Sequence, residues 1–436
     1  MAPRVLETPA GVPGSVVYLR AGLGAKLCAK PRFSQQTCFQ QSRCVAQQGN
    51  LPGMNRRQLE IWGSAATAEP LSEDPAYLTE QLITYIGNKR ALLPFIGEAV
   101  DRVRRMTGSE RLTFLDAFAG SGAVSRYFKQ YAHRVVSNDL EEYAWVNGQC
   151  YLANRSDIDE AELRSVHRAV LERASAEPVL DGMFRRLYAP KDDQNIQPGE
   201  RVFYTVKNAQ RLDTLRTAIA GVAAEWRPFV LAPLIAMASV HANTSGVFKG
   251  FYKNRETGIG CFGGAAGDAL TRILGEITLR HPVFSRFSCE WEMHCRDAGD
   301  LVRELEPVDV AYFDPPYNQH PYGSNYFMLN LLCRYEEPAE VSAVSGIPTD
   351  WKRSAYNKAR QAEQAMADLV KHTRARFILV SYNDEGFIKP NVMRDVLEER
   401  GRVERFDRQY NTFRGSRNLK GRSIHVNEQL FLVDCR

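Results

Sequence analysis

Residues 111–123 read RLTFLDAFAGSGA, a short apolar run that ends in an acid and is followed by a glycine turn. The apolar run is typical of a buried strand, and a helical pattern begins just after the turn. Gly120 and Gly122 let the backbone approach a ligand closely and direct helix N–H groups toward it. A second strand, RVVSND at residues 134–139, ends in Asp139. Strand, glycine turn, helix, strand and acid together predict a βαβ unit and therefore an α/β fold.

The acid at the end of the second strand indicates which ligand the turn could hold. Asp139 stands 17 residues after Gly122, close to the ~20-residue spacing at which a carboxylate binds the ribose of an adenosine cofactor. A dinucleotide and S-adenosylmethionine both fit this spacing. A dinucleotide fingerprint would have a third glycine where the chain has Ser125, which weakens the dinucleotide interpretation. A purely structural turn between strand and helix is the third interpretation at this point.

A second informative stretch, VDVAYFDPPYNQHPY, covers residues 308–322. Its first six residues predict a short buried strand. Pro315 and Pro316 end that strand, because they have no N–H for a sheet ladder, and they hold the chain stiff and extended. The result is a rigid segment that carries the carboxylate of Asp314, free carbonyl acceptors and the ring of Tyr317. Taken alone, the segment also fits an ordinary strand end followed by a turn.

The overall composition is that of an ordered globular protein. The 436 residues are 44% hydrophobic and 25% charged, and they leave room for one large domain or two ordinary ones. The net charge is +5, but residues 1–53 hold six basic residues against one acid, so residues 54–436 are formally neutral. Any nucleic-acid binding must therefore come from local patches. We expect it from the basic run at 405–422 and the loop at 246–255.

Neither a metal nor a membrane is expected as a partner. The nine cysteines are scattered, without a CxxC pair or a paired Cys/His spacing, which argues against a zinc site and a disulfide framework. The most apolar stretch, residues 228–240, is too short to span a bilayer. It predicts a buried helix.

Three regions of the chain differ in character. Residues 1–53 are poor in acids and are expected to be a disordered extension. They are either a transit peptide or, as we prefer, sequence upstream of a natural start at Met54. Residues 54–150 and 286–436 alternate strands and helices, whereas residues 151–285 have mostly helical patterns and predict an insertion. Helices are predicted at about 95–105, 160–176, 208–226, 228–243 and 268–279, and further strands at 287–293, 377–382, 402–410 and 429–433.

From about Tyr85 to the C-terminus, the sequence resembles the alpha group of N6-adenine DNA methyltransferases, which includes Dam-like enzymes and many modification methylases of restriction systems. The resemblance rests on several elements that occur in the family's order. They are Tyr85-Ile86-Gly87-Asn88-Lys89, the turn Asp116 to Gly122, Asp139, an acid before the catalytic strand (Asp297, with Asp300 as rival), Asp314-Pro315-Pro316-Tyr317 with Tyr322 and Asn325-Tyr326, and the later segments 381–386 and 410–414.

The resemblance implies an α/β, Rossmann-like core that uses S-adenosylmethionine as co-substrate. The cofactor-binding residues that it implies are Tyr85, Gly87, Lys89, Asp116, Phe118, Gly120, Gly122, Asp139 and Asp297. The catalytic residues that it implies are Asp314, Pro315, Pro316 and Tyr317.

The resemblance also gives the rigid proline segment a chemical role. The N6 amine of adenine is a poor nucleophile, because its lone pair is delocalised into the ring. The Asp314 carboxylate and the Pro315 carbonyl would accept its two hydrogens and raise the electron density on nitrogen as it attacks the methyl group. The atom is unreachable inside a duplex, so the base must be flipped out. Tyr317 would then stack on it.

We therefore expect a site-specific adenine-N6 methyltransferase of double-stranded DNA in the cytoplasm of a prokaryote, paired with a restriction endonuclease. Residues 151–285 would form its target-recognition region. One alternative is an N4-cytosine enzyme, in which Ser usually replaces Asp314; another is an enzyme acting on RNA or a protein amide, in which Asn usually replaces it. A third is a catalytically silent DNA-binding protein, against which the intact Asp314, Gly120 and Lys89 argue.

Overall fold

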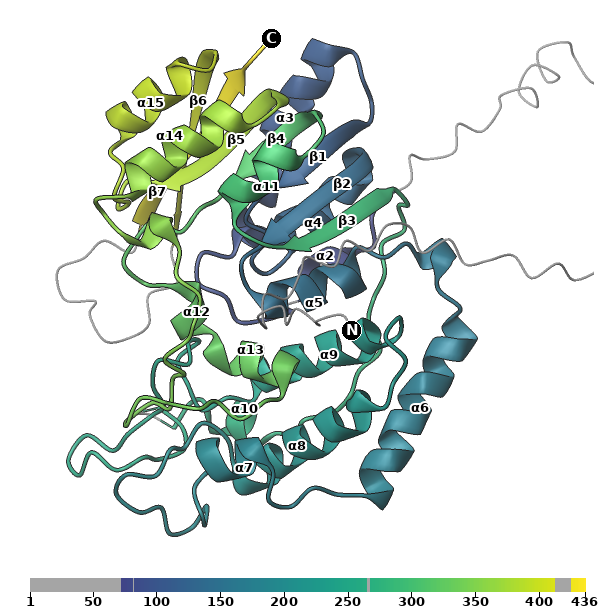
Figure 1. The fold of residues 1–436 in the computed structure, drawn as a ribbon, viewed down its shortest axis with the longest axis vertical. Helices are drawn as coiled ribbons and strands as arrows, with labels where there is room; N and C mark the ends of the chain where they lie inside the picture. Colours follow the sequence, from purple (N-terminus) through teal and green to yellow (C-terminus); the bar gives the residue numbers. More distant parts are fainter. Residues whose placement is uncertain (1–71, 81, 265–266, 412–424) are drawn as a thin grey trace, which may run out of the picture. The chain divides into compact units, whose positions relative to one another are not determined.

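The structure is a computed structural model that describes residues 72–80, 82–264, 267–411 and 425–436. The predicted N-terminal extension, its alternative start and most of the C-terminal basic run lie outside these ranges. Within them, a seven-stranded sheet carries helices on both faces, and a second group of helices lies below the sheet in the view of Figure 1.

The strands of the sheet follow the order β3-β2-β1-β4-β5-β7-β6. β7 pairs antiparallel with β5 and β6, whereas the other pairs are parallel. This mixed sheet confirms the predicted α/β fold class, and each predicted strand of the core is present. The strands are β1 (Leu112–Asp116), β2 (Ala132–Asp139), β3 (Glu290–Cys295), β4 (Val308–Phe313), β5 (Ala375–Asn383), β6 (Arg402–Asn411) and β7 (His425–Asp434).

The glycine-turn stretch occupies the centre of the sheet. β1 is buried at all of its positions and runs parallel to both β2 and β4. The register places Asp116, the last residue of β1, opposite Tyr312 of β4. The connections after β1 and β4 leave toward opposite halves of the sheet, and this arrangement opens the crevice in which α/β sheets bind ligands. The glycine turn and the Asp-Pro-Pro segment therefore begin next to each other.

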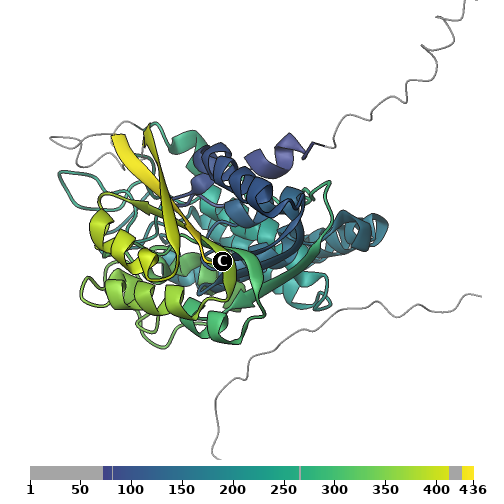
Figure 2. The same cartoon turned by 90° about the horizontal axis from the view of Figure 1, so that it is seen from above.

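Helices cover both faces of the sheet, and Figure 2 shows the dark blue α3 on one side and the yellow-green α14 and α15 on the other. Val100 of α3 and Phe128 of α4 belong to one apolar core, while Met366 of α14 and Leu397 of α15 belong to the second. These helices and turns are η1 (Lys89–Leu92), α3 (Leu93–Thr107), α4 (Ala123–Phe128), η2 (Lys129–Tyr131), α5 (Glu142–Tyr151), α11 (Ala298–Glu304), η4 (Ala355–Asn357), α14 (Ala362–His372) and α15 (Pro390–Glu398).

The predicted insertion forms helices at three of the expected places and differs at the fourth. The helix predicted at 268–279 is wrong in length, because Gly275 turns the backbone to an extended conformation (ψ 152°). The N–H of Ile277 then donates to Asn208 Oδ1 (3.2 Å) instead of continuing the helix. The remaining helices and turns are α2 (Pro75–Thr79), η3 (Arg155–Asp157), α6 (Glu160–Ala176), α7 (Met183–Tyr188), α8 (Val206–Ala220), α9 (Arg227–Val240), α10 (Leu270–Leu274), α12 (Tyr322–Asn325) and α13 (Phe327–Arg334).

The helical region shares its apolar core with segments on either side of it in the sequence. Tyr77, Tyr143 and Phe327 lie in the same cluster as Leu212 of α8 and Leu234 of α9. α9 is buried over most of its length, as predicted for its apolar sequence. Across the part of the chain that the structure describes, we find no helix with both the length and the apolar character of a membrane span.

Candidate active site

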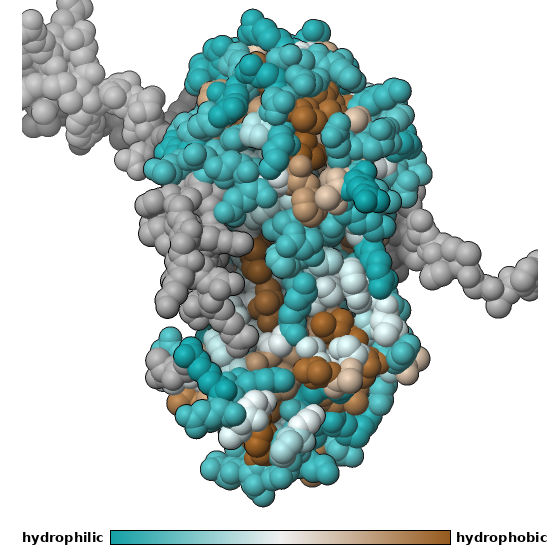
Figure 3. Space-filling view, turned by 90° about the vertical axis from the view of Figure 1, so that its left-hand side faces the viewer, coloured by the Kyte–Doolittle hydropathy of each residue, from teal (hydrophilic) through white to brown (hydrophobic). Residues whose placement is uncertain are grey.

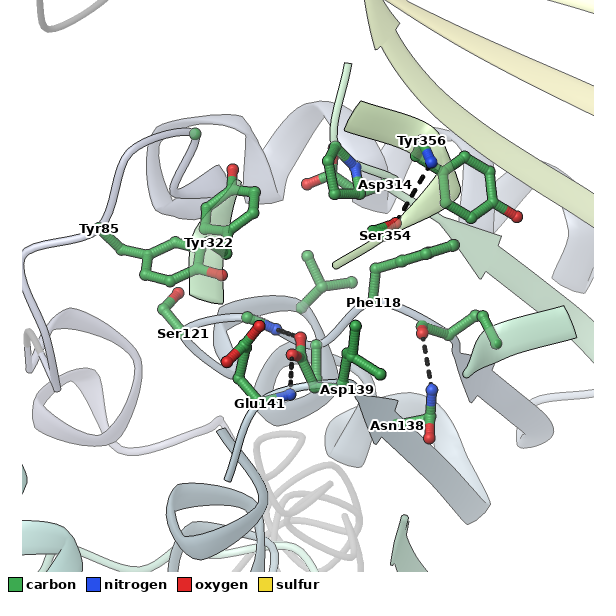
Figure 4. Close-up of a pocket in the computed structure, with 18 of the residues that line it drawn as sticks. Tyr85, Phe118, Ser121, Asn138, Asp139, Glu141, Asp314, Tyr322, Ser354 and Tyr356 are labelled. Atoms are coloured by element: carbon green, nitrogen blue, oxygen red, sulfur yellow. Dashed lines mark hydrogen bonds between the residues drawn. The ribbon is translucent and has the colours of Figure 1, made fainter. Parts of the chain in front are cut away.

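A cleft of about 840 Å³, measured out to its opening, lies at the carboxyl ends of β1, β2 and β4 (Figure 4). The site residues predicted from the sequence mostly line it: nine of the thirteen do, from five separate parts of the chain. The nine are Tyr85, Gly87, Lys89, Phe118, Gly120, Asp139, Asp297, Asp314 and Pro316.

The glycine turn and the acid of β2 are fixed to each other by hydrogen bonds. The N–H groups of Gly120 and Glu141 donate to the two carboxylate oxygens of Asp139, at 2.7 and 2.9 Å, as Figure 4 shows. Gly120 has a φ of +52°, and a Cβ there would lie 2.8 Å from the ring of Tyr85. A side chain at this position would therefore strain the backbone and collide with the opposite wall. The turn forms the floor of the cleft only because residue 120 is glycine.

Two residues of the predicted cofactor loop lie beneath the cleft instead of lining it. Asp116 is buried and accepts a hydrogen bond from Ser125 Oγ (2.5 Å), which also lies 2.6 Å from Ser137 Oγ. Burial raises the pKa of Asp116 to about 7. Gly122 caps α4 with a φ of +74°. The serine in place of a third glycine thus bonds the end of β1 to β2.

Stacked tyrosines hold the segment of Gly87 against α12. The ring of Tyr85 stacks on both Tyr322 and Tyr326, with centroids 4.9 and 4.8 Å away, and those two rings are 6.0 Å from each other. The hydroxyl of Tyr322 donates to the carbonyl of Ile86 (3.1 Å), and the N–H of Ile86 donates to Tyr326 Oη (2.8 Å). These contacts place the Tyr-x-Gly-x-Lys element beside the segment that follows the Asp-Pro-Pro motif, as Figure 4 shows for Tyr85 and Tyr322.

The ammonium of Lys89 joins the predicted catalytic acid to a carboxylate of β7. Lys89 Nζ lies 3.1 Å from Asp314 Oδ1 and 2.8 Å from Glu428 Oε1. The second oxygen of Asp314 has no hydrogen-bond partner among the described residues, and Asp314 faces the cleft. Burial raises the pKa of Asp314 to about 6, even though Lys89 acts in the opposite direction. Lys89, which was predicted to bind cofactor, therefore contacts the predicted catalytic acid.

The two remaining predicted residues of the tetrad shape the wall beside Asp314. Pro315 is buried. The ring of Tyr317 meets Tyr382 edge to face, with centroids 6.2 Å apart, and its carbonyl accepts the N–H of Phe387 (3.0 Å). The loop after β5 thus supports the Asp-Pro-Pro-Tyr segment, and fixes the directions of its acceptors.

The far end of the cleft combines aromatic and acidic groups. The ring of Phe118 meets Tyr356 edge to face, with centroids 5.2 Å apart. Asp297 lines the cleft and caps α11, where Oδ1 accepts the N–H groups of Gly299 (2.8 Å) and Asp300 (3.4 Å). The structure therefore brings Asp297, and not its rival, to the cleft.

The sequence analysis missed several residues that line or support the cleft. Glu141 is buried and accepts a hydrogen bond from Asn330 Nδ2 (2.6 Å). Burial raises the pKa of Glu141 to about 7, and Asp139 adds to this effect. Its position two residues after Asp139 was a usable signal. Lys352 and Glu428 come from segments far along the chain, and nothing near them in sequence marks them as part of a site.

A family model described as D12 class N6 adenine-specific DNA methyltransferase matches residues 85–396. Modification methylase StsI of Streptococcus sanguinis is 30% identical over 331 residues, which cover 72% of this chain and 46% of that protein. Type II methyltransferase M.NlaIII of Neisseria lactamica is 26% identical over 367 residues, and M.CviAII of Paramecium bursaria Chlorella virus 1 is 28% identical over 360. Those matches cover 80% of this chain and 100% and 98% of the two relatives. The chain thus spans about half of the StsI protein and nearly all of the other two.

Proposed function

Since the chain belongs to the family of D12 class N6 adenine-specific DNA methyltransferases, we propose that it methylates N6 of an adenine that is flipped out of double-stranded DNA. The observation that carries this proposal is the position of Asp314. Its carboxylate stands on a rigid proline segment and faces the same cleft as the glycine turn. The cleft can therefore hold a methyl donor and a base side by side.

The residues of the cleft fit S-adenosylmethionine, which would supply an activated methyl group on a sulfonium. The aromatic pair of Phe118 and Tyr356 offers an apolar wall for an adenine ring, and Asp297 lies beside it. Asp139 and Glu141 are buried carboxylates that can accept bonds from hydroxyl or ammonium groups. We assign the nine predicted cofactor residues to this role, with Asp116 and Gly122 acting through the shape of the turn.

The catalytic step requires two acceptors for the amine hydrogens of adenine. Asp314 offers its second oxygen, and the carbonyl of Pro315 lies next to it in the chain. Acceptors that are fixed before the reaction stabilise the positive charge that develops on nitrogen, without the cost of reorienting solvent. Pro316 keeps the segment stiff, and Tyr317 provides a ring face for the extruded base.

We assign residues 151–285 to target recognition. The loop after α9 reaches the catalytic half of the protein, where the N–H of Phe248 donates to the carbonyl of Asn325 (2.7 Å). In the same loop, Lys253 Nζ lies 5.1 Å from the ring centroid of Phe251. The face in Figure 3 has apolar and weakly polar residues at mid-height between two mainly hydrophilic parts, on the side where α12 lies in Figure 1. We propose that DNA approaches from this side.

We also propose that the enzyme protects host DNA in a restriction–modification system in the cytoplasm of a prokaryote. The names of the relatives, type II methyltransferases and modification methylases, support this role. A cognate endonuclease would then fail to cut DNA that the enzyme has methylated.

Methylation of cellular DNA tests the proposed function directly. Single-molecule sequencing of DNA from cells that express the protein should reveal N6-methyladenine in one short motif, absent from cells without the gene. Purified protein should transfer label from S-adenosylmethionine to the same motif. N4-methylcytosine as the product, or no modification of DNA, contradicts the proposal.

Changing Tyr317 to alanine should weaken capture of the flipped base and spare cofactor binding. Stacking of a base on an aromatic ring contributes about 1–3 kcal/mol, so the fluorescence gain of 2-aminopurine at the target position should fall markedly. Tyr317→Phe should restore most of the signal, because the ring face is required and not the hydroxyl. As a control, Tyr131→Ala breaks an edge-to-face pair with Tyr127 (5.4 Å) outside the cleft and should leave the fluorescence unchanged. An equal loss in Tyr317→Phe and Tyr317→Ala would argue against stacking.

A further inference from the structure

Glu428 lies behind the catalytic acid and is anchored on two sides. It is 1% exposed, and its Oε1 accepts hydrogen bonds from Lys89 Nζ (2.8 Å) and from Ser381 Oγ of β5 (2.5 Å). Lys89 is 4% exposed and spans from Glu428 to Asp314. The other oxygen of Glu428, Oε2, is buried without a hydrogen-bond partner in the described part of the chain.

This arrangement is unfavourable for stability alone. A buried carboxylate loses hydration, and an oxygen left without a partner costs about 1–3 kcal/mol. A buried ion pair is often no more stable than an apolar pair of similar volume. Lys89 nonetheless contacts Asp314, the acid that faces the cleft, as well as Glu428. A buried carboxylate with an unpaired oxygen, such as Glu428, therefore needs an explanation other than packing.

We propose that Glu428 is a positioning residue, which shares the Lys89 ammonium with Asp314 so that Asp314 remains a strong acceptor for the amine of adenine. The inference rests on the proposed function. Without Glu428, Lys89 and Asp314 would form an isolated pair whose charges cancel. With Glu428, the three groups carry one net negative charge, and Lys89 fixes the orientation of Asp314 without neutralising it.

The surroundings of Asp314 support this account of its charge. The titratable groups that interact with Asp314 are Lys89 of η1, Glu428 of β7, Tyr312 of β4, Asp116 of β1 and Tyr322, and Tyr317 interacts with Lys89.

Burial shifts the pKa values of the acid and of the lysine in opposite directions, whereas Glu428 raises both. Burial raises the pKa of Asp314 to about 6; Lys89 acts to lower it, and Glu428 raises it further. Burial lowers the pKa of Lys89, but Asp314 and Glu428 outweigh burial and raise it well above its usual value, so that Lys89 stays charged.

The pH dependence of single-turnover methylation tests the proposal, because ionised Asp314 is a much stronger acceptor for the amine hydrogens than protonated Asp314. The rate therefore rises as the pH passes upward through the pKa of Asp314. Glu428→Gln removes a negative charge, so the rise should move to lower pH by about one unit and the plateau rate should fall about tenfold. Lys89→Met removes a positive charge, so the rise should move to higher pH. The double variant should return it toward the wild-type position.

Binding and stability measurements separate positioning from a structural role. By calorimetry, Glu428→Gln should bind S-adenosylmethionine within about twofold of wild type, since the loss concerns the chemical step. As a matched control, Glu73→Gln changes a buried carboxylate that accepts hydrogen bonds from Ser285 Oγ and the N–H of Arg286. It should affect thermal stability without moving the pH profile.

Three results would overturn the inference. They are a wild-type pH profile and rate in Glu428→Gln, an equal loss of rate at every pH, and shifts of the same sign in Glu428→Gln and Lys89→Met. If Glu428→Gln does not fold, the double variant compared with Lys89→Met decides, because the two differ only at Glu428, and a rise at the same pH in both overturns the inference. Failure of the proposed function would show differently, as a wild-type enzyme that does not methylate adenine.

Discussion

Replacing Asp314 by alanine is expected to slow single-turnover methyl transfer at least about 100-fold, the effect of losing a preorganised acceptor. Binding of S-adenosylmethionine should remain nearly normal, because the glycine turn, Asp139 and the aromatic pair at the far end of the cleft are unchanged. The fold should survive, because Lys89 keeps its 2.8 Å contact with Glu428 and no buried cation is left unpaired. The variant should also still bind DNA.

Isothermal titration with the cofactor, set beside rapid-quench methyl transfer, measures the two effects separately. Asp309→Ala is the matched control, because Asp309 lies on the same strand, β4, but toward its opposite end. There it accepts the N–H of Thr113 (2.9 Å) and pairs with Arg376 (3.0 Å). This control should lose stability and keep its rate of transfer when folded. Turnover near the wild-type rate in Asp314→Ala would contradict the proposed mechanism even though the fold is correct.

Local sequence was sufficient to predict the strands and helices whose ends are set by neighbouring residues. β1 and β2 begin and end within two residues of their predicted positions, because apolar runs bounded by glycine or an acid signal buried strands. The helix expected at 268–279 was too long, because its apolar spacing continues past Gly275, where the backbone becomes extended. Periodicity alone does not show that a side chain such as Asn208 competes for the next backbone N–H.

The site, too, combines contacts between residues close in sequence, which can be predicted, with contacts between distant residues, which cannot. The glycine turn and Asp139 belong to one βαβ unit, so their spacing in sequence predicts their contact in space. The meeting of Lys89 with Glu428 joins the first and last elements of the catalytic region. It depends on β7 entering the sheet antiparallel beside β5. Nothing around Glu428 in sequence distinguishes it from an acid on an exposed strand, and only the three-dimensional arrangement reveals it.

Gly120→Val should abolish measurable cofactor binding, and this should be its largest effect on the site. A left-handed backbone conformation costs an ordinary residue roughly 1–2 kcal/mol, and a β-branched residue avoids it still more strongly. The new Cβ would also lie 2.8 Å from the Tyr85 ring, which itself stacks on two further tyrosines and has little room to move.

Gly122→Ala isolates the backbone cost from the steric one. Gly122 has a φ of +74°, but a Cβ there meets nothing within 4 Å. Its cofactor affinity should therefore fall by about tenfold at most, the equivalent of about 1.4 kcal/mol, whereas Gly120→Val should lose at least about 100-fold because strain and collision add. Titration of both variants with S-adenosylmethionine, with thermal melts to confirm folding, makes the comparison. Equal losses in the two variants would mean that the close approach of the turn to Tyr85 does not shape the cofactor site.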